Sequence, residues 1–336
     1  MALPIINSLT CCCSYKKTVT PYLPQLYKLP TNILQLWKSP DELKKLYLST
    51  NPFITALAFS LFLAFLFFVS SVINRNNSQV DRFWSILPSV YNLHFVLFAK
   101  LSSLQTTRLK IMFVVGVLWM LIKVREIIRK AMNPIQFLIF NIIFVSLAQS
   151  VLLFLITTPS YIILLVAQVS PKNSTADCVF ASVLIALIAI EFISDQQQWS
   201  TLKLLNPNFQ EAKRNYNENS ELLHGYQKED LDRGFLAQGL WSLSRHPNFA
   251  AEQAIWIVFY LHGCWTTKTL FNWTSCGFIS YLLLFQGSTV LTEKISAGKY
   301  CEYVEYQKKV GKFIPKIYIK PFGDSPRKRK AENKSL

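Results

Sequence analysis

The residues best suited to chemistry lie in one short stretch, from Arg245 to Glu252, that opens an apolar segment. Pro247 suits the first turn of a helix, so Arg245 and His246 should lie at the mouth of that helix. Helix N-termini attract anions through unpaired N–H groups, and a neighbouring guanidinium can contact a phosphate through two of its own. The stretch predicts either an anion-binding pocket or, more simply, a snorkelling arginine and a capping histidine at a span boundary.

Buried carboxylates favour the pocket. Glu252 lies one turn inside the apolar segment, where a carboxylate costs about 2.5–3.5 kcal/mol at mid-bilayer and usually faces a cavity or a partner. Glu191 and Asp195 end an earlier apolar segment, and because they are four residues apart they share one helical face. Carboxylates and an Arg–His pair that face the same compartment predict a polar pocket.

Membrane helices must position these residues. Hydrophobic residues make up 51% of the 336-residue chain, which points to a bilayer as its solvent. Residues 53–73 carry no charge, and at about 1.5 Å per residue they cover a hydrocarbon core of about 30 Å. Further spans are expected at 83–99, 111–122, 135–157, 178–194, 249–264 and 270–291. The sequence predicts an all-α membrane bundle of about seven transmembrane helices.

The charge pattern predicts how the chain is oriented. The formal net charge is +16, and the basic residues crowd the ends of apolar segments and the tail from Arg327 to Lys330. By the positive-inside rule that tail is cytosolic, as is the polar loop at 195–248. The glycosylation triplet Asn173-Ser174-Thr175 then falls in the lumen. We expect insertion into the endoplasmic reticulum membrane and no binding of nucleic acid, because no recognition module accompanies the charge.

Three regions are expected along the chain: an N-terminal interfacial or flexible segment at 1–50, a membrane domain at 51–320, and a basic disordered tail at 321–336. Seven spans would place the lysines of the first region in the lumen, so either one segment is re-entrant or residues 22–47 lie along the interface. The seven cysteines lack the spacing of a zinc or redox motif, and no metal site is expected. The absence of a G-x-G-x-x-G or P-loop motif excludes a Rossmann or P-loop nucleotide site.

Four patches of sequence resemble a known superfamily. Arg245 to Phe249, followed by Glu252, resembles the C-terminal signature of the steroid 5α-reductases, sterol reductases and isoprenylcysteine methyltransferases. Asp195 to Trp199, and Asp81 to Pro88 with Tyr91, resemble the branch called DUF1295, the steroid 5α-reductase-like membrane proteins. Near its C-terminal end this branch has an acidic residue after the last span and two tyrosines before a proline. Here that pattern is matched by Glu293, Tyr303, Tyr306 and Pro315. Together the patches cover residues 80–316, most of the chain.

The resemblance implies a cytosolic site for NADPH. In the reductases of this superfamily, residues at matching positions contact the phosphates, ribose or nicotinamide amide, close the pocket, or lie at its rim. Here those positions are Arg245, His246, Asn248 and Glu252, with Asp195 from the preceding span, Tyr303 and Tyr306 as closing residues, and Gln198 and Trp199 at the rim. Two positions depart from the pattern: Phe249 replaces its usual Tyr, and Ala251 replaces a common Gly.

The reaction that the resemblance implies is hydride delivery from NADPH to a polarised carbon–carbon double bond in a lipid that enters from the bilayer. Tyr91 and Asp81 are the catalytic candidates on the substrate side, with Tyr91 donating a hydrogen bond to the polarised oxygen. A Tyr and an Asp that flank a span are also typical interface anchors.

Two alternatives stay open. A membrane methyltransferase that uses S-adenosylmethionine shares the Arg-His-Pro run and the tyrosine-containing tail, whereas Asp195 with the glutamine triplet and Trp199 favours the reductase branch. A non-catalytic lipid-binding protein of the same fold would be consistent with Phe249 and Ala251. Oligomeric state and substrate identity do not follow from the sequence.

Overall fold

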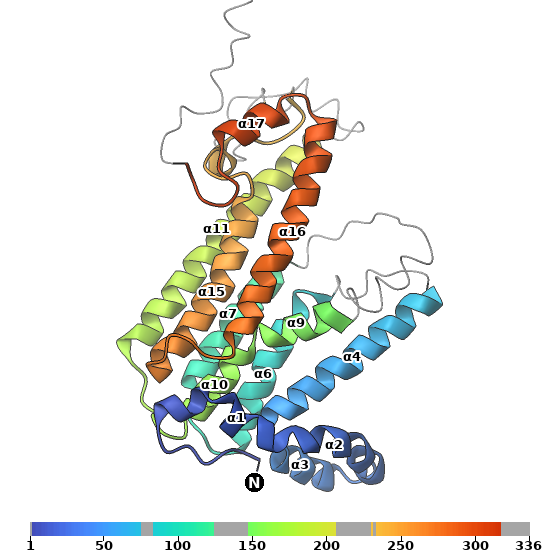
Figure 1. The fold of residues 1–336 in the computed structure, drawn as a ribbon, viewed down its shortest axis with the longest axis vertical. Helices are drawn as coiled ribbons and strands as arrows, with labels where there is room; N and C mark the ends of the chain where they lie inside the picture. Colours follow the sequence, from blue (N-terminus) through green and yellow to red (C-terminus); the bar gives the residue numbers. More distant parts are fainter. Residues whose placement is uncertain (1, 75–82, 124–146, 206–229, 231–232, 317–336) are drawn as a thin grey trace, which may run out of the picture. The chain divides into compact units, whose positions relative to one another are not determined.

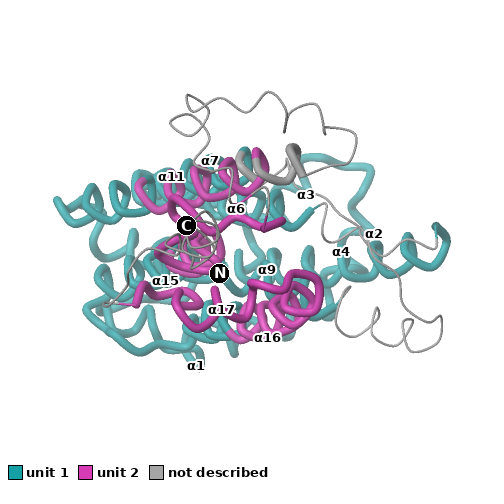
Figure 2. The backbone as a smooth tube through the Cα atoms, turned by 90° about the horizontal axis from the view of Figure 1, so that it is seen from above, with its two compact units in different colours: residues 1–185, 255–282 teal, residues 186–254, 283–336 magenta. Residues whose placement is uncertain are grey.

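The computed structural model describes residues 2–74, 83–123, 147–205, 230 and 233–316. They divide into two compact units, which are coloured separately in Figure 2. Unit 1 comprises residues 1–185 and 255–282, and unit 2 comprises residues 186–254 and 283–336. Over the described ranges both units are helical and contain no strand, which confirms the predicted all-α class.

The helices are labelled in Figure 1. Unit 1 holds the N-terminal helices and several apolar ones. Its elements are η1 (Leu9–Cys13), α1 (Tyr15–Thr18), η2 (Thr20–Tyr22), α2 (Leu23–Leu36), α3 (Pro40–Ser49), α4 (Pro52–Asn74), α6 (Ile86–Leu101), α7 (Thr107–Lys123), α9 (Gln149–Leu155) and α10 (Thr158–Val166). Unit 2 holds η5 (Gly239–Ser242) and α17 (Tyr303–Lys309). Residues of both units contribute to α11 (Thr175–Leu205), α15 (Pro247–Thr267) and α16 (Ser275–Lys299).

Four helical segments are long and apolar enough to cross a bilayer: Pro52–Asn74, Gln149–Val166, Thr175–Ser200 and Ser275–Lys299. This is the character of a multi-pass membrane protein. The predicted spans at 53–73, 83–99, 111–122, 178–194, 249–264 and 270–291 fall wholly or largely on α4, α6, α7, α11, α15 and α16. The count of seven spans stays a prediction, because α6 has only 16 residues.

One predicted boundary is wrong. The span expected at 135–157 begins outside the described residues, and its helical segment continues to Val166. The segment is interrupted between α9 and α10, where Pro159 occupies the first turn of α10 and provides no N–H to the preceding helix. The hydroxyl of Thr158 replaces that donor, since Thr158 Oγ1 donates to Leu155 O at 2.7 Å. The neighbouring Thr157 Oγ1 donates to Phe154 O, also at 2.7 Å.

The N-terminal segment is tied into unit 1 by buried hydrogen bonds. Asn51, which precedes α4, donates from Nδ2 to Tyr161 OH at 3.0 Å, and its Oδ1 accepts from Phe53 N at 2.9 Å. The Tyr161 hydroxyl in turn donates to Thr18 O at 2.8 Å. Because the ring of Phe53 packs on those of Phe154 and Tyr161, the start of α4 is fixed by both polar and apolar contacts.

A buried charged cluster joins three helices of unit 1. Arg108 Nε, near the start of α7, donates to both oxygens of Asp177 at 3.1 Å. His262, on α15, contacts the same carboxylate through Nε2 at 2.8 Å. Arg108 also donates from Nη1 to Ser170 O at 3.0 Å. Each polar atom in the cluster is matched by a partner, so these residues hold the helix ends together.

Candidate functional site

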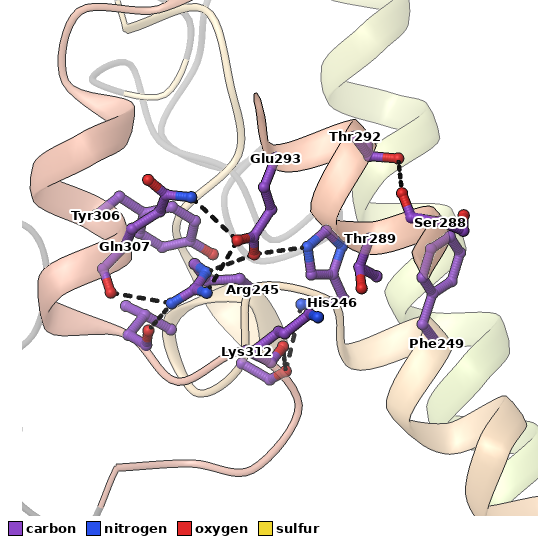
Figure 3. A network of polar contacts seen from close by, with 12 residues as sticks. Arg245, His246, Phe249, Ser288, Thr289, Thr292, Glu293, Tyr306, Gln307 and Lys312 are labelled. Atoms are coloured by element: carbon purple, nitrogen blue, oxygen red, sulfur yellow. Dashed lines mark hydrogen bonds and ion pairs between the residues drawn. The ribbon is translucent and has the colours of Figure 1, made fainter. Parts of the chain in front are cut away.

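One carboxylate of unit 2 contacts four donor groups (Figure 3). Glu293, on α16, accepts from Arg245 Nε at 2.8 Å and from Arg245 Nη2 at 3.1 Å. It also contacts His246 Nε2 at 3.0 Å and accepts from Gln307 Nε2 at 3.0 Å. We call these four residues the Glu293 network. Motif residues that lie far apart in the sequence meet in it.

Most of the hydrogen-bond donors of Arg245 are already engaged within the protein. Besides the carboxylate, its Nη1 donates to Gln307 O at 2.9 Å and to Val310 O. Four of the five N–H groups of the guanidinium are therefore engaged. A guanidinium held in this way fixes the position of the chain segment after α17, and it has little capacity left for a ligand.

Hydrogen bonds to backbone carbonyls join the same two chain segments, before α15 and after α17. Arg245 N donates to Gly311 O at 2.8 Å, His246 N to Lys312 O at 3.2 Å, and Ser244 Oγ to Lys312 O at 3.0 Å. A side chain at Gly311 would place its Cβ 2.0 Å from Ile314 O, so the turn requires a glycine. Residues 244–246 and 310–312 are thus held as one rigid piece.

A second polar contact links α11 to α15. Asn248 Nδ2 donates to Asp195 Oδ1 at 2.9 Å, and both side chains are buried. The Asn248 amide oxygen accepts from Phe249 N at 2.9 Å, which fixes the orientation of the amide. Glu252 follows one turn later on α15 and is only 3% exposed. Carboxylate and amide groups of this kind bind hydroxyl and amide groups of a ligand.

The two closing tyrosines form a small core with Phe235, whose ring centroid lies 5.2 Å from that of Tyr303 and 5.4 Å from that of Tyr306. The Tyr306 hydroxyl donates to Trp241 O. Trp241 Nε1 in turn donates to Ser194 O at 3.2 Å. Burial raises the pKa of Tyr303 to about 12, so its hydroxyl stays protonated at neutral pH. In this structure both tyrosines pack α17 against the loop before α15.

His246 is buried and neutral at physiological pH. Burial lowers the pKa of its imidazole below the ordinary value of 6.5, and the adjacent Glu293 opposes that shift without cancelling it. The ring stacks on Phe249, with centroids 5.6 Å apart and planes 14° from parallel. Because neutral imidazole donates through one nitrogen only, the contact with Glu293 places the proton on Nε2.

Lys312 is a cation of this region that contacts neutral groups. Its ammonium donates to Gln286 Oε1 at 3.0 Å, and its carbonyl accepts from His246 N. Lysine carries three donors on a flexible stem. Lys312 can therefore reach a phosphate while the backbone to which it belongs stays fixed.

The structure places most of the predicted site residues in unit 2. Arg245 and His246 meet at Glu293, Asp195 meets Asn248, and Tyr303 and Tyr306 share one core. Gln198 is half-buried and Trp199 is exposed, both on α11. Whether any of them binds a cofactor stays a prediction.

The substrate-side candidates belong to unit 1. Tyr91 is buried on α6, where its ring lies 6.1 Å from that of Phe59 and 5.5 Å from that of Phe154. Its hydroxyl makes no hydrogen bond to any described residue. Asp81 lies outside the described residues.

Sequence reasoning missed several residues that shape this region. Gln307, Trp241 and Lys312 act through contacts that no spacing rule predicts. Gln197 belongs to a recognised motif, yet its function is local: its Oε1 accepts from Leu240 N at 3.1 Å. The sequence signal for this contact was the glycine at position 239. In the structure Gly239 has a positive φ of 61° and lies close to the Gln197 amide, and both features favour glycine.

The comparisons with known proteins agree with the motif pattern. Residues 67–310 match the model of a family of proteins of unknown function, DUF1295. An uncharacterized protein of Schizosaccharomyces pombe is 33% identical over 338 residues, which cover 94% of this chain and 93% of that protein. No solved structure matches the chain.

Proposed function

The chain belongs to the DUF1295 family, and from this premise we propose that it is a membrane-embedded, NADPH-dependent reductase of a carbon–carbon double bond in a lipid. The observation that carries the proposal is the Asp195–Asn248 hydrogen bond. It joins the motif that begins at Asp195 on α11 to the motif that runs from Arg245 to Glu252 at the start of α15. Such a gathering of polar groups supports a nucleotide site more than a set of independent interface anchors.

The residues of unit 2 suit the different parts of the dinucleotide. The carboxylates of Asp195 and Glu252 can accept hydrogen bonds from ribose hydroxyls or from the carboxamide, and the Asn248 amide can do so through its oxygen or donate. Carboxylates repel phosphates, and Arg245 is engaged by Glu293. We therefore assign the phosphate contact to Lys312. When bound, NADPH supplies the hydride.

The Glu293 network has a positioning role in this proposal. It holds residues 310–312 against residues 244–246, so that Lys312 and Asn248 keep a fixed separation. A site held by packed neighbours loses less conformational entropy on binding than a mobile one. Arg245, Glu293 and Gln307 accordingly act through the residues they position.

On the substrate side, the apolar helices suit a lipid that enters from the bilayer. Tyr91 is the proposed hydrogen-bond donor to the polarised oxygen, because its buried hydroxyl has no hydrogen-bond partner in the described part of the chain. Asp81 is retained as its proposed companion. We place the protein in the endoplasmic reticulum membrane, with the loop at 195–248 and the C-terminus in the cytosol.

Titration of the purified full-length protein in detergent tests the nucleotide site. We expect NADPH to quench tryptophan fluorescence in a saturable way, with competition by NADP⁺ and none by S-adenosylmethionine. Lys312→Ala should weaken NADPH binding roughly tenfold to a hundredfold, because a hydrogen bond to a charged group is worth about 1.5–3 kcal/mol. Lys308→Ala is the matched control, an exposed lysine on α17 whose loss should leave the affinity unchanged.

Each other outcome contradicts part of the proposal. Binding of S-adenosylmethionine in place of NADPH would indicate a methyltransferase of the same fold. Binding of neither cofactor would indicate a non-catalytic lipid-binding protein. Equal NADPH affinity of Lys312→Ala and wild type would remove Lys312 from the phosphate contact while retaining the reductase.

A further inference from the structure

Helix α2 exposes large apolar side chains although it is too short to cross a bilayer. Its 14 residues, with Pro30 inside the helix, span about 21 Å at about 1.5 Å per residue, against a hydrocarbon core of about 30 Å. Tyr27 is nevertheless 82% exposed and Leu34 74%, and Trp37, which caps the helix, is 63% exposed. Apolar side chains exposed together on a helix that does not span the bilayer indicate an interaction surface.

These side chains form one continuous stripe. Tyr27, Pro30, Leu34 and Trp37 are all exposed and follow one another at intervals of three and four residues. Residues with this spacing lie above one another on the same side of a helix. We call these four residues the α2 stripe.

The other residues of α2 form two further sides. Lys28, Thr31 and Gln35 are exposed at the same spacing and make a polar side. Leu29, which is buried, and Leu36, which is half-buried, lie seven residues apart on the side that packs within unit 1. A helix with one packed side, one exposed apolar side and one exposed polar side is typical of the boundary between an apolar and an aqueous phase.

A hydrogen bond holds α2 at the point where a membrane span begins. Gln25 Oε1 accepts from Asn51 N at 2.8 Å, and α4 begins at the next residue, Pro52. Because α4 is among the described helices that are long and apolar enough to cross a bilayer, its start marks one boundary of the hydrocarbon core. Figure 1 shows α2 beside the start of α4 and at an angle to it. The α2 stripe is therefore at the level where headgroups meet acyl chains.

The charges of α2 match phospholipid headgroups. A lysine directly follows each exposed aromatic residue: Lys28 follows Tyr27, and Lys38 follows Trp37. The Lys38 ammonium lies 5.5 Å from the centroid of the Trp37 ring, and no acidic residue occurs from Leu23 to Lys38. Tryptophan and tyrosine are enriched at membrane–water interfaces, and a lysine stem can lie along apolar surface while its ammonium reaches a phosphate.

We propose that α2 is a phospholipid-docking helix. The α2 stripe lies among the upper acyl carbons of the leaflet in which α4 begins, and Lys28 and Lys38 contact the lipid phosphates. A second copy of the chain matches these charges less well, because a symmetric contact through α2 brings lysines together without an acidic residue from this helix. Of the two arrangements that the sequence left open, α2 takes the one along the interface, and it anchors the start of α4 to one leaflet. The inference rests on unit 1 alone and holds whether or not the chain is a reductase.

Quenching of tryptophan fluorescence by brominated phospholipids tests the position of the stripe. The full-length protein is placed in nanodiscs of phosphatidylcholine that carries bromine either near the headgroup or near the chain ends. The emission that Trp37→Phe removes should be quenched by roughly half or more by the shallow bromine and less by the deep one, because an interfacial helix lies about 5–10 Å into the headgroup and acyl boundary. The emission that Trp119→Phe removes is the matched control, since that ring is buried in the protein and should be quenched less.

Variants on the two exposed sides of α2 test the stripe itself. Leu34→Glu places a carboxylate in the stripe and should reduce the shallow quenching of the Trp37 emission at least twofold. Thr31→Glu places the same group on the polar side and should leave the quenching unchanged. Replacing both lysines, Lys28→Gln with Lys38→Gln, should reduce the quenching by a smaller factor, because the phosphate contacts add to the apolar burial. Each variant is measured against its own Trp37→Phe counterpart, and circular dichroism checks that it remains helical.

Several results would overturn the proposal. Shallow quenching of the Trp37 emission no greater than that of Trp119 would mean that the stripe is not in lipid, and a dimer in light scattering would then identify a second copy as its cover. Stronger quenching by the deep bromine would indicate a re-entrant segment. Equal effects of Leu34→Glu and Thr31→Glu would exclude the stripe as the side in contact with lipid, and no effect of replacing the two lysines would exclude the phosphate contacts.

Discussion

The two units differ in how far their buried polar side chains are paired with other protein groups. Around Glu293 in unit 2, four donors meet one carboxylate and the guanidinium opposite it is almost fully engaged. Beside Gly116 in unit 1, Ser89 Oγ and Asn92 Nδ2 are buried without a hydrogen-bond partner among the described residues. The polar groups around Glu293 largely satisfy one another and so hold their segments together, whereas Ser89 and Asn92 each keep a buried atom for a partner outside the described chain, such as internal water.

This contrast changes how the motif residues are interpreted. The arginine and histidine that dominate the sequence signature contribute mainly to the architecture of unit 2, whereas Ser89 and Asn92 in unit 1 each retain a hydrogen-bonding atom without a described partner. The four predictions that follow test the contrast, beginning with the largest expected effect.

Breaking the Glu293 network should cost the most. Arg245→Ala leaves a carboxylate without its main partner and removes two contacts to the segment after α17, so the free energy of unfolding should fall by about 3 kcal/mol or more. Thermal unfolding in detergent measures the change. Lys309→Ala is the control, because its salt bridge with Glu305 is exposed and should contribute little. An Arg245→Ala protein as stable as the control would show that the network is not structural.

Unit 1 should be intolerant of change where its backbones approach closely, despite its unsatisfied donors. A Cβ at Gly277 would lie 2.3 Å from Leu155 O, so Gly277→Ala forces α16 away from α9 and should destabilise the protein by about 1–3 kcal/mol. Gly287→Ala on the same helix meets nothing within 4 Å and should be neutral or stabilising by up to about 1 kcal/mol. Equal melting temperatures for the two variants would contradict the packing of unit 1.

The Glu293 network should also weaken in mild acid. Because burial lowers the pKa of His246, the unfolded chain takes up a proton near pH 6.5 that the folded protein resists. Stability is therefore complete above that pH and declines as the pH falls toward the folded pKa. We expect the melting temperature to drop between about pH 7.5 and 5.5, a window above the ordinary titration of carboxylates. His246→Gln should flatten this part of the profile, and a profile identical to wild type would exclude His246 as its source.

The smallest expected effect comes from comparing one buried serine of each unit. Ser244 Oγ donates to Lys312 O at 3.0 Å, so Ser244→Ala should cost about 1 kcal/mol. Ser89 Oγ has no such partner among the described residues, so Ser89→Ala in the absence of ligand should be neutral or slightly stabilising. Comparable losses in both serine variants, measured by thermal unfolding, would mean that Ser89 is already satisfied.

The sequence predicted the parts of the fold that depend on local composition. A charge-free run identified α4 almost to the residue, because an apolar stretch of that length has few alternatives. The span expected at 135–157 was predicted to end too early. Pro159 had not been recognised as part of the first turn of the helix that continues the segment. The signature residues from Arg245 to Glu252 were found because charge stands out in an apolar segment.

The partners of those residues could not be predicted. That Arg245 would meet Glu293 and two carbonyls, and that Asn248 would meet Asp195, depends on how helices far apart in the sequence pack together. Ser89, Asn92 and Gly116 gave no signal at all, because small polar residues and a glycine in an apolar helix are common. Their significance lies in which atoms remain without partners after folding.

Transfer of deuterium from the cofactor to a lipid tests the central claim most directly. The purified protein is incubated with a total lipid extract and NADPH carrying deuterium at the transferred position, and lipids are compared by mass spectrometry. We predict a product heavier than its precursor by one deuterium and one hydrogen, formed by wild type and by Glu305→Gln but strongly reduced with Asp195→Asn. If wild type transfers no deuterium although it binds NADPH and remains folded, the chain is not the reductase proposed here.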